Sequence, residues 1–195
     1  KAGDVYFIAK RDATVRSALY KVDSKGAITA LTDPAYNVSG VQFSPDGKYL
    51  AYSTSDFSDT NIAYWDEGLN VSDIETKTSK TIELEYIPKN DKYLATRSPF
   101  YFADMDFDEQ DELVVVGWKG GRQYAHIYDV YEISDSNAHK KTTPPFDCVE
   151  LGITKFNPKK KQIIHSYVNL FRSEVYFYQK VNEEFILQEV IKTEF

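Results

Sequence analysis

Three segments of the chain align without gaps, and this repeat constrains the fold more than any other feature of the sequence. The three segments are FSPDGKYLAYS at 43–53, FDEQDELVVVG at 107–117 and FNPKKKQIIHS at 156–166. Each begins with Phe, continues through a polar turn and ends in a run with the composition of a strand. The repeat therefore predicts three copies of a strand, a turn and a second strand.

Two more strands follow each copy of the repeat. Alternating apolar and polar residues predict a third strand at 69–74, 126–133 and 174–180. A fourth strand is predicted near 80–86, 140–143 and 185–191. Four consecutive antiparallel strands make one blade of a β-propeller, so the chain is predicted to be all-β. An aromatic share of 15%, with 15 Tyr and 12 Phe, agrees with a strand-rich chain.

The N-terminal part of the chain matches an incomplete blade. Strands predicted at 5–9, 18–23 and 27–32 correspond to strands two, three and four, and the inner strand is absent. We therefore predict one domain over 1–195, a propeller or propeller segment of about four four-stranded antiparallel blades, the first lacking its inner strand. The repeats fall at 1–32 (partial), 33–87, 88–144 and 145–195.

An absent inner strand leaves backbone groups of the first blade unpaired, which natural sheets normally avoid. We expect the position to be filled in one of three ways, unless the ring stays open. Residues upstream of Lys1, another chain, or the C-terminal segment near Phe195 could each supply the strand.

The first full repeat resembles a known family. VQFSPDGKYLAYSTS at 41–55, followed by LNVSDIETKTSKTI at 69–82, resembles the TolB-type, WD-like propeller repeat with its aromatic-Ser-Pro-Asp-Gly turn. The other two copies have DEQD at 108–111 and NPKK at 157–160 in place of that turn. The resemblance implies a periplasmic accessory protein that binds other proteins, or the noncatalytic propeller domain of a prolyl-oligopeptidase-like peptidase. It also implies an extracytoplasmic location, in the periplasm or cell envelope.

The residues with catalytic potential are better explained as structure. Ser44 lies in Ser-Pro-Asp-Gly, where Pro45 and Gly47 supply the backbone angles of a turn, and no G-x-S-x-G elbow occurs in the sequence. His126, His139 and His165 lack metal-binding spacing, and we expect His165 to be buried and hydrogen-bonded. We therefore predict no enzyme activity and no cofactor. The lack of a histidine cluster also disfavours a carbohydrate-active propeller enzyme.

The acidic run at 104–112, DMDFDEQDE, suggests calcium at first sight. It has Glu109 where an EF-hand loop needs Gly, and Val115 where that loop needs a bidentate Glu. The repeat alignment places Asp104 and Asp106 on the inner strand, with 108–112 in the turn. We predict a solvated acidic edge and no metal site.

The charge, the length of the apolar runs and the cysteine content exclude several classes of partner and protein. A net charge of −7 and a pI near 5 argue against nucleic acid and anionic membranes. The apolar runs are too short to cross a membrane, and the lone Cys148 excludes an internal disulfide.

Arginine and tryptophan gather in one class of predicted loop. Loops joining strand two to strand three, and strand four to the next blade, emerge on one face of a propeller. All five arginines and both tryptophans fall in these loops. Arg, Trp and Tyr are enriched at binding hot spots, and guanidinium groups match carboxylates. The predicted binding residues are Arg11, Arg16, Tyr64, Trp65, Arg97, Trp118, Arg122, Tyr124, Phe171 and Arg172.

From the composition of these loops we predict a noncatalytic scaffold that recognises a protein or peptide, which can be an acidic one. One alternative is that the arginines only pair with loop acids such as Asp56, Asp59 and Asp66. A second is that the chain is the propeller portion of a larger prolyl-oligopeptidase-like hydrolase and gates substrate access to a catalytic domain.

Overall fold

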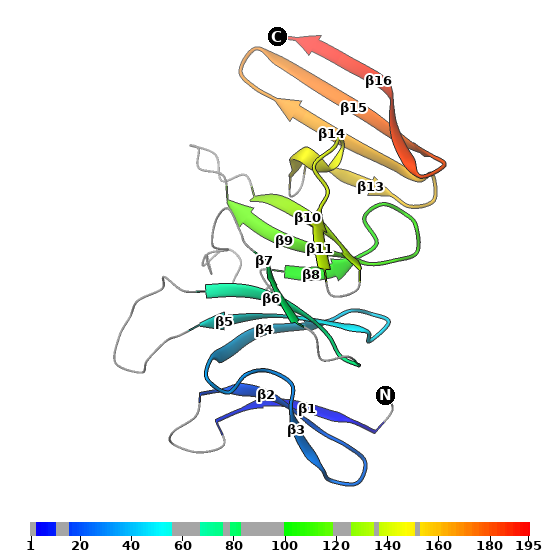
Figure 1. Ribbon diagram of the computed structural model, residues 1–195. Helices are drawn as coiled ribbons and strands as arrows, with labels where there is room; N and C mark the ends of the chain where they lie inside the picture. Colours follow the sequence, from blue (N-terminus) through cyan, green and yellow to red (C-terminus); the bar gives the residue numbers. More distant parts are fainter. Residues whose placement is uncertain are drawn as a thin grey trace. The chain divides into compact units, whose positions relative to one another are not determined.

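The computed structural model describes residues 3–10, 16–55, 67–75, 79–82, 100–118, 126–134, 137–150 and 153–195. Four antiparallel sheets, each built from consecutive strands, make up this part of the chain (Figure 1). This connectivity is that of propeller blades and confirms the all-β propeller prediction. No helix within the described ranges has the length and apolar character that crossing a membrane requires.

The chain divides into two compact units. One consists of Lys1–Ile87 with Ile133–Ala138, and the other of Pro88–Glu132 with His139–Phe195. The prediction of a single domain over 1–195 stays a prediction.

The first sheet has three strands in the order β1 (Val5–Ala9), β2 (Ala18–Val22) and β3 (Ile28–Ala30). Among the described residues, β1 pairs with β2 alone, so the inner strand is missing here as predicted. The C-terminal segment is hydrogen-bonded within the fourth sheet through Glu194 and Phe195. All three sources of an inner strand stay predictions.

The second sheet contains β4 (Asn37–Phe43), β5 (Tyr49–Ser55), β6 (Glu67–Asp73) and β7 (Ser79–Ile82) in sequence order. The turn predicted between its first two strands is present. The Gly47 N–H donates to the Ser44 carbonyl at 2.8 Å, and Gly47 has a φ of 71°, which favours glycine.

The first and second sheets pack together in one compact unit. Leu19, Val38, Leu50 and Tyr52 form its buried cluster. The rings of Tyr6 and Phe43 meet edge to face, with centroids 4.8 Å apart. Because strand side chains alternate between faces, Leu50 and Tyr52, two residues apart on β5, both reach the cluster.

The third sheet orders β11 (Asn137–Lys140), β10 (His126–Ser134), β9 (Glu112–Trp118) and β8 (Phe100–Ala103), with the short β12 (Val149–Glu150) also paired to β10. A single 3-10 turn, η1 (Phe146–Cys148), precedes β12.

The third sheet corrects the gapless repeat alignment. Phe43 ends β4 and Phe156 lies in β13, but Phe107 lies in a turn with a φ of 66°. Asp104 and Asp106 also lie in this turn and not on the inner strand, which ends at Ala103. The reason is local: the Asp104 carboxylate accepts hydrogen bonds from successive backbone N–H groups, which ends the ladder.

The fourth sheet orders β13 (Lys155–Asn157), β14 (Gln162–Val168), β15 (Arg172–Val181) and β16 (Glu184–Glu194). It packs on the third sheet within the second compact unit. Their shared buried cluster includes Phe107, Val130, Phe146 and Ile163, and the ring of Phe185 on β16 lies 5.5 Å from that of Phe146.

Candidate functional site

The structure describes only part of the predicted binding face. Six of the ten predicted residues lie outside the described ranges: Arg11, Tyr64, Trp65, Arg97, Arg122 and Tyr124. Trp118 ends β9, and its side chain is not described. Arg16 lies in the first compact unit, where its N–H donates to the Pro34 carbonyl at 3.0 Å. Phe171 and Arg172 lie together where β14 turns into β15.

The tip of the β14–β15 hairpin is held by one side chain. The Asn169 Oδ1 atom accepts hydrogen bonds from the N–H groups of Phe171 and Arg172, each at 2.9 Å. The Asn169 N–H donates to the Arg172 carbonyl, also at 2.9 Å. An Asn side chain that bonds backbone two and three residues ahead fixes a turn, so this tip has a defined conformation.

Large apolar side chains project from this fixed tip. Leu170 is 89% exposed and Phe171 is 76% exposed. Val168 and Phe195 are also exposed, and the Phe195 N–H donates to the Phe171 carbonyl at 2.9 Å. We call Val168, Leu170, Phe171 and Phe195 the hairpin-tip patch. Exposed apolar side chains that lie close together on a folded surface are typical of interaction sites.

A buried carboxylate positions cations beside the patch. Glu174 accepts a hydrogen bond from the Tyr176 hydroxyl at 2.7 Å, and lies 3.1 Å from Lys192 Nζ and 3.7 Å from Arg172 Nε. The Tyr176 hydrogen bond, then Lys192, lower the pKa of Glu174, so it stays ionised at neutral pH. Arg172 thus pairs with a nearby acid while its side chain remains about half exposed.

The acidic run at 104–112 is a hydrogen-bonded turn. Side-chain oxygens of Asp104, Asp106 and Asp108 lie within 4.8 Å of one another. Asp104 accepts backbone N–H groups, Asp106 contacts two lysines, and Asp108 accepts the Gln110 N–H at 2.8 Å. These carboxylates have internal partners, so the turn is held by its own side chains.

Ser44 and His165 also have structural partners. The Ser44 hydroxyl donates to Asp46 Oδ1 at 2.5 Å and accepts the Tyr49 N–H at 2.8 Å. His165 Nδ1 lies 2.9 Å from the Thr154 hydroxyl, and partial burial lowers the His165 pKa. The hydrogen-bonded histidine that we predicted is present, although it is only half-buried.

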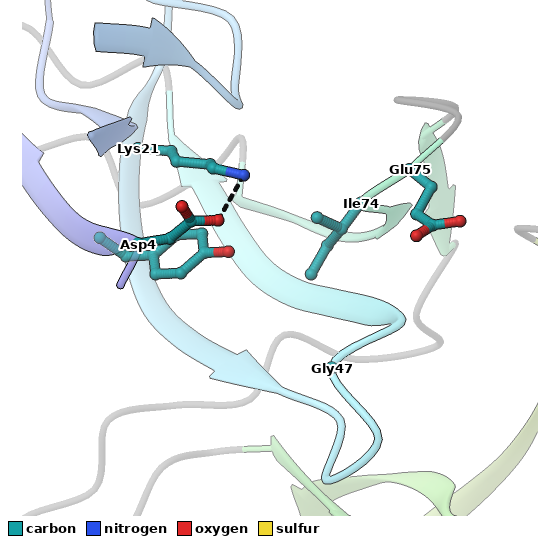
Figure 2. Close-up of a pocket in the computed structure, with 6 residues that line it drawn as sticks. Asp4, Lys21, Gly47, Ile74 and Glu75 are labelled. Atoms are coloured by element: carbon teal, nitrogen blue, oxygen red, sulfur yellow. Dashed lines mark ion pairs between the residues drawn. The ribbon is translucent and has the colours of Figure 1, made fainter. Parts of the chain in front are cut away.

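A pocket that sequence reasoning missed lies in the first compact unit (Figure 2). It has a volume of about 300 Å³ and is lined by Asp4, Tyr6, Lys21, Gly47, Ile74 and Glu75. Figure 2 shows Asp4 and Lys21 on one side, joined by a 2.6 Å ion pair, with Ile74 and Glu75 opposite. The hydrogen bond with Asp4 raises the pKa of Lys21, so the pair is charged at neutral pH. Tyr6 and Lys21 face each other in the β1–β2 register, which the local sequence pattern does not reveal.

Comparisons with known proteins bear on the first part of the chain. Residues 1–61 match the family described as the dipeptidyl peptidase IV (DPP IV) N-terminal region. No curated protein matches the sequence. Among solved structures, the chain is similar to the crystal structure of TolB from Acinetobacter baumannii, with 16% sequence identity and a TM-score of 0.41. The match covers 95% of this chain and 40% of that one, so the chain spans less than half the length of the TolB chain. The sheets described above, together with the family match, support the predicted propeller repeat of the TolB type over part of the chain.

Proposed function

We propose that this chain is a noncatalytic binding scaffold that recognises a protein or peptide through its loop face, with the hairpin-tip patch as a principal contact. The observation that carries the proposal is the exposure of Leu170 and Phe171 on a turn fixed by Asn169. A rigid tip loses little conformational entropy on binding, and its apolar side chains gain free energy when a partner removes them from water.

The cations beside the patch indicate the chemistry of the partner. Arg172 and Lys192 are both exposed, and both contact Glu174, which restricts their positions. An apolar segment with an adjacent carboxylate complements this arrangement, because guanidinium groups bind carboxylates with directional hydrogen bonds. We therefore propose an acidic peptide or protein loop as the partner. By the resemblance stated above, we also propose an extracytoplasmic location.

The proposal of a noncatalytic role rests on Ser44 and His165, whose side chains form hydrogen bonds that hold the local structure. The Ser44 hydroxyl has a donor and an acceptor within its own turn, and His165 bonds Thr154. A serine nucleophile would instead need a base within hydrogen-bonding reach.

Site-specific photo-crosslinking tests the binding surface. A photoreactive residue at position 171 should capture a partner in the native host, and one at Val181 should not. Val181 is a matched control, because it is also exposed and lies at the other end of β15. The captured partner is then purified, and its Kd is measured against wild type, Phe171→Ser, Arg172→Glu and Val181→Ser.

We expect Phe171→Ser and Arg172→Glu each to raise the Kd about tenfold or more, as hot-spot substitutions do. Val181→Ser should leave the Kd unchanged. The proposal fails if position 171 captures nothing that position 181 does not capture, or if Phe171→Ser binds as tightly as wild type.

The match of residues 1–61 to the dipeptidyl peptidase IV N-terminal region favours a second candidate function. The chain would then be the propeller portion of a larger prolyl-oligopeptidase-like hydrolase, and would gate substrate access. The test is the complete open reading frame and labelling of the native protein with a fluorophosphonate serine-hydrolase probe. A downstream G-x-S-x-G and probe labelling would support this candidate, and the lack of both would exclude it.

A further inference from the structure

An ionic cluster joins the third and fourth sheets inside the second compact unit. Asp106, in the β8–β9 turn, lies 2.7 Å from Lys141 Nζ and 3.4 Å from Lys180 Nζ. Lys141 follows β11 of the third sheet, whereas Lys180 comes from β15 of the fourth. Asp106 is thus the shared anion of two lysines from different sheets. We call these three residues the ionic junction.

The ionic junction is largely removed from water. The Lys180 side chain is 5% exposed and the Asp106 side chain 13%. Lys141 Nζ lies 5.6 Å from the centre of the Phe146 ring, which belongs to the buried cluster between the sheets. Charges in such a place interact strongly and are costly to leave unpaired. The free energy with which the third and fourth sheets pack together therefore depends on how many charged groups the ionic junction contains.

A second carboxylate, Glu112, lies buried beside the ionic junction. Its Oε2 atom accepts the Met105 N–H at 2.8 Å, and its Oε1 atom is 3.9 Å from Lys141 Nζ. Burial first, and then the charges of Asp106 and Asp108, raise the pKa of Glu112 to about 7 against the opposing effects of the Met105 hydrogen bond and Lys141. Among the residues that the structure describes, two exposed acids also contact these lysines: Glu132 lies 3.7 Å from Lys141, and Glu183 lies 3.8 Å from Lys180.

We propose that Glu112 is a proton switch for the ionic junction between the third and fourth sheets. When Glu112 is protonated, Asp106 is the only buried carboxylate among the described residues of this cluster that carries a negative charge opposite the two lysines, and the exposed Glu132 and Glu183 add to it. When Glu112 loses its proton, a second buried anion forms beside Asp106. The desolvation cost of that charge and its repulsion from Asp106 outweigh its attraction to Lys141. The ionic junction consequently stabilises the packing of the third sheet on the fourth more at mildly acidic pH than at mildly alkaline pH.

The direction of the effect follows from proton linkage. An unfolded glutamate has a pKa near 4.5, and in the folded chain Glu112 holds its proton to about pH 7. Between these values the folded state binds more protons, so folding becomes less favourable as pH rises. Above both pKa values, the stability that protonated Glu112 contributes to the folded state is fully lost.

The sole methionine provides a direct probe of this group. Met105 is the only Met in the sequence and its N–H donates to Glu112, so ¹⁵N-methionine labelling of the full chain reports on the carboxyl through one assigned amide signal. We expect the shift of this signal to titrate with a midpoint near 7. The midpoint should fall in Asp106→Asn, because that variant lacks the nearby negative charge. The titration should vanish in Glu112→Gln.

Amide hydrogen exchange tests the consequence for the sheets. After correction for intrinsic exchange rates, protection of β15 should be roughly tenfold lower at pH 8 than at pH 6 in wild type, and should change less in Glu112→Gln. A Met105 midpoint near 4.5, a titration that persists in Glu112→Gln, or equal changes in protection in wild type and variant would each overturn the proposal.

Discussion

Lys180 Nζ lies 3.4 Å from Asp106 Oδ1, although 74 residues separate the two in the sequence. This contact joins a β15 side chain of the fourth sheet to a turn of the third. Because Lys180 is almost fully buried, its ammonium depends on protein partners for compensation. The contact is therefore a specific ion pair that stabilises the packing of the fourth sheet on the third.

Removing the shared anion should destabilise the chain. In Asp106→Asn, Lys141 and Lys180 lose their common carboxylate, and we expect the free energy of unfolding to fall by about 2 kcal/mol. Urea denaturation at pH 7 measures this change. Glu183→Gln is the control, since Glu183 is 89% exposed and its contact with Lys180 should contribute less than about 0.5 kcal/mol. Similar losses in both variants would contradict the importance of Asp106.

Loss of the Ser44 hydroxyl should weaken the turn without affecting binding. In Ser44→Ala, the buried Tyr49 N–H loses its 2.8 Å side-chain acceptor, and we expect about 1–2 kcal/mol lower unfolding free energy. Partner affinity should not change, because the role of Ser44 is structural. Thermal denaturation and a Kd measurement check both parts. The prediction is contradicted if Ser44→Ala keeps the wild-type melting temperature but no longer binds the partner.

The fixed conformation of the hairpin tip should depend on Asn169. Asn169→Ala removes the acceptor for the N–H groups of Phe171 and Arg172, so their amide exchange should accelerate and stability should fall by about 1 kcal/mol. Partner affinity should also fall, because binding must then order the tip. Leu170→Ala is the comparison: it removes exposed apolar surface and should leave the exchange of both amides unchanged.

His165 should make stability decrease at acidic pH. Burial, partly opposed by Glu150 and Asp147, lowers its pKa below 6.5, so as pH falls through 6.5 the unfolded chain takes up a proton at this residue more readily than the folded chain. The free energy of unfolding should therefore fall as pH drops from 6.5, and this fall should be smaller in His165→Asn. Because Glu112 acts in the opposite direction, urea denaturation between pH 5 and 7.5 is best compared in the Glu112→Gln background. Identical pH profiles with and without His165 would contradict the assignment.

Local sequence patterns predicted most of the strands. Alternation predicted β1 at its observed bounds, and the strands at 126–133 and 174–180 were predicted within a few residues of β10 and β15. The turn at Ser44 was predicted because Pro45 and Gly47 restrict the backbone in a way that needs no distant contact. The same reasoning failed at Phe107, where identity at one aligned position concealed a turn closed by Asp104.

The sequence alone determined the order of the strands and the Ser44 turn, because side-chain alternation and turn chemistry act between near neighbours. Only the tertiary structure decided which charges meet. Asp106 and Lys180, or Asp4 and Lys21, come together through strand register and sheet packing, which no local pattern encodes. Packing also decides which carboxylate loses water, and burial is the main reason that the pKa of Glu112 is raised.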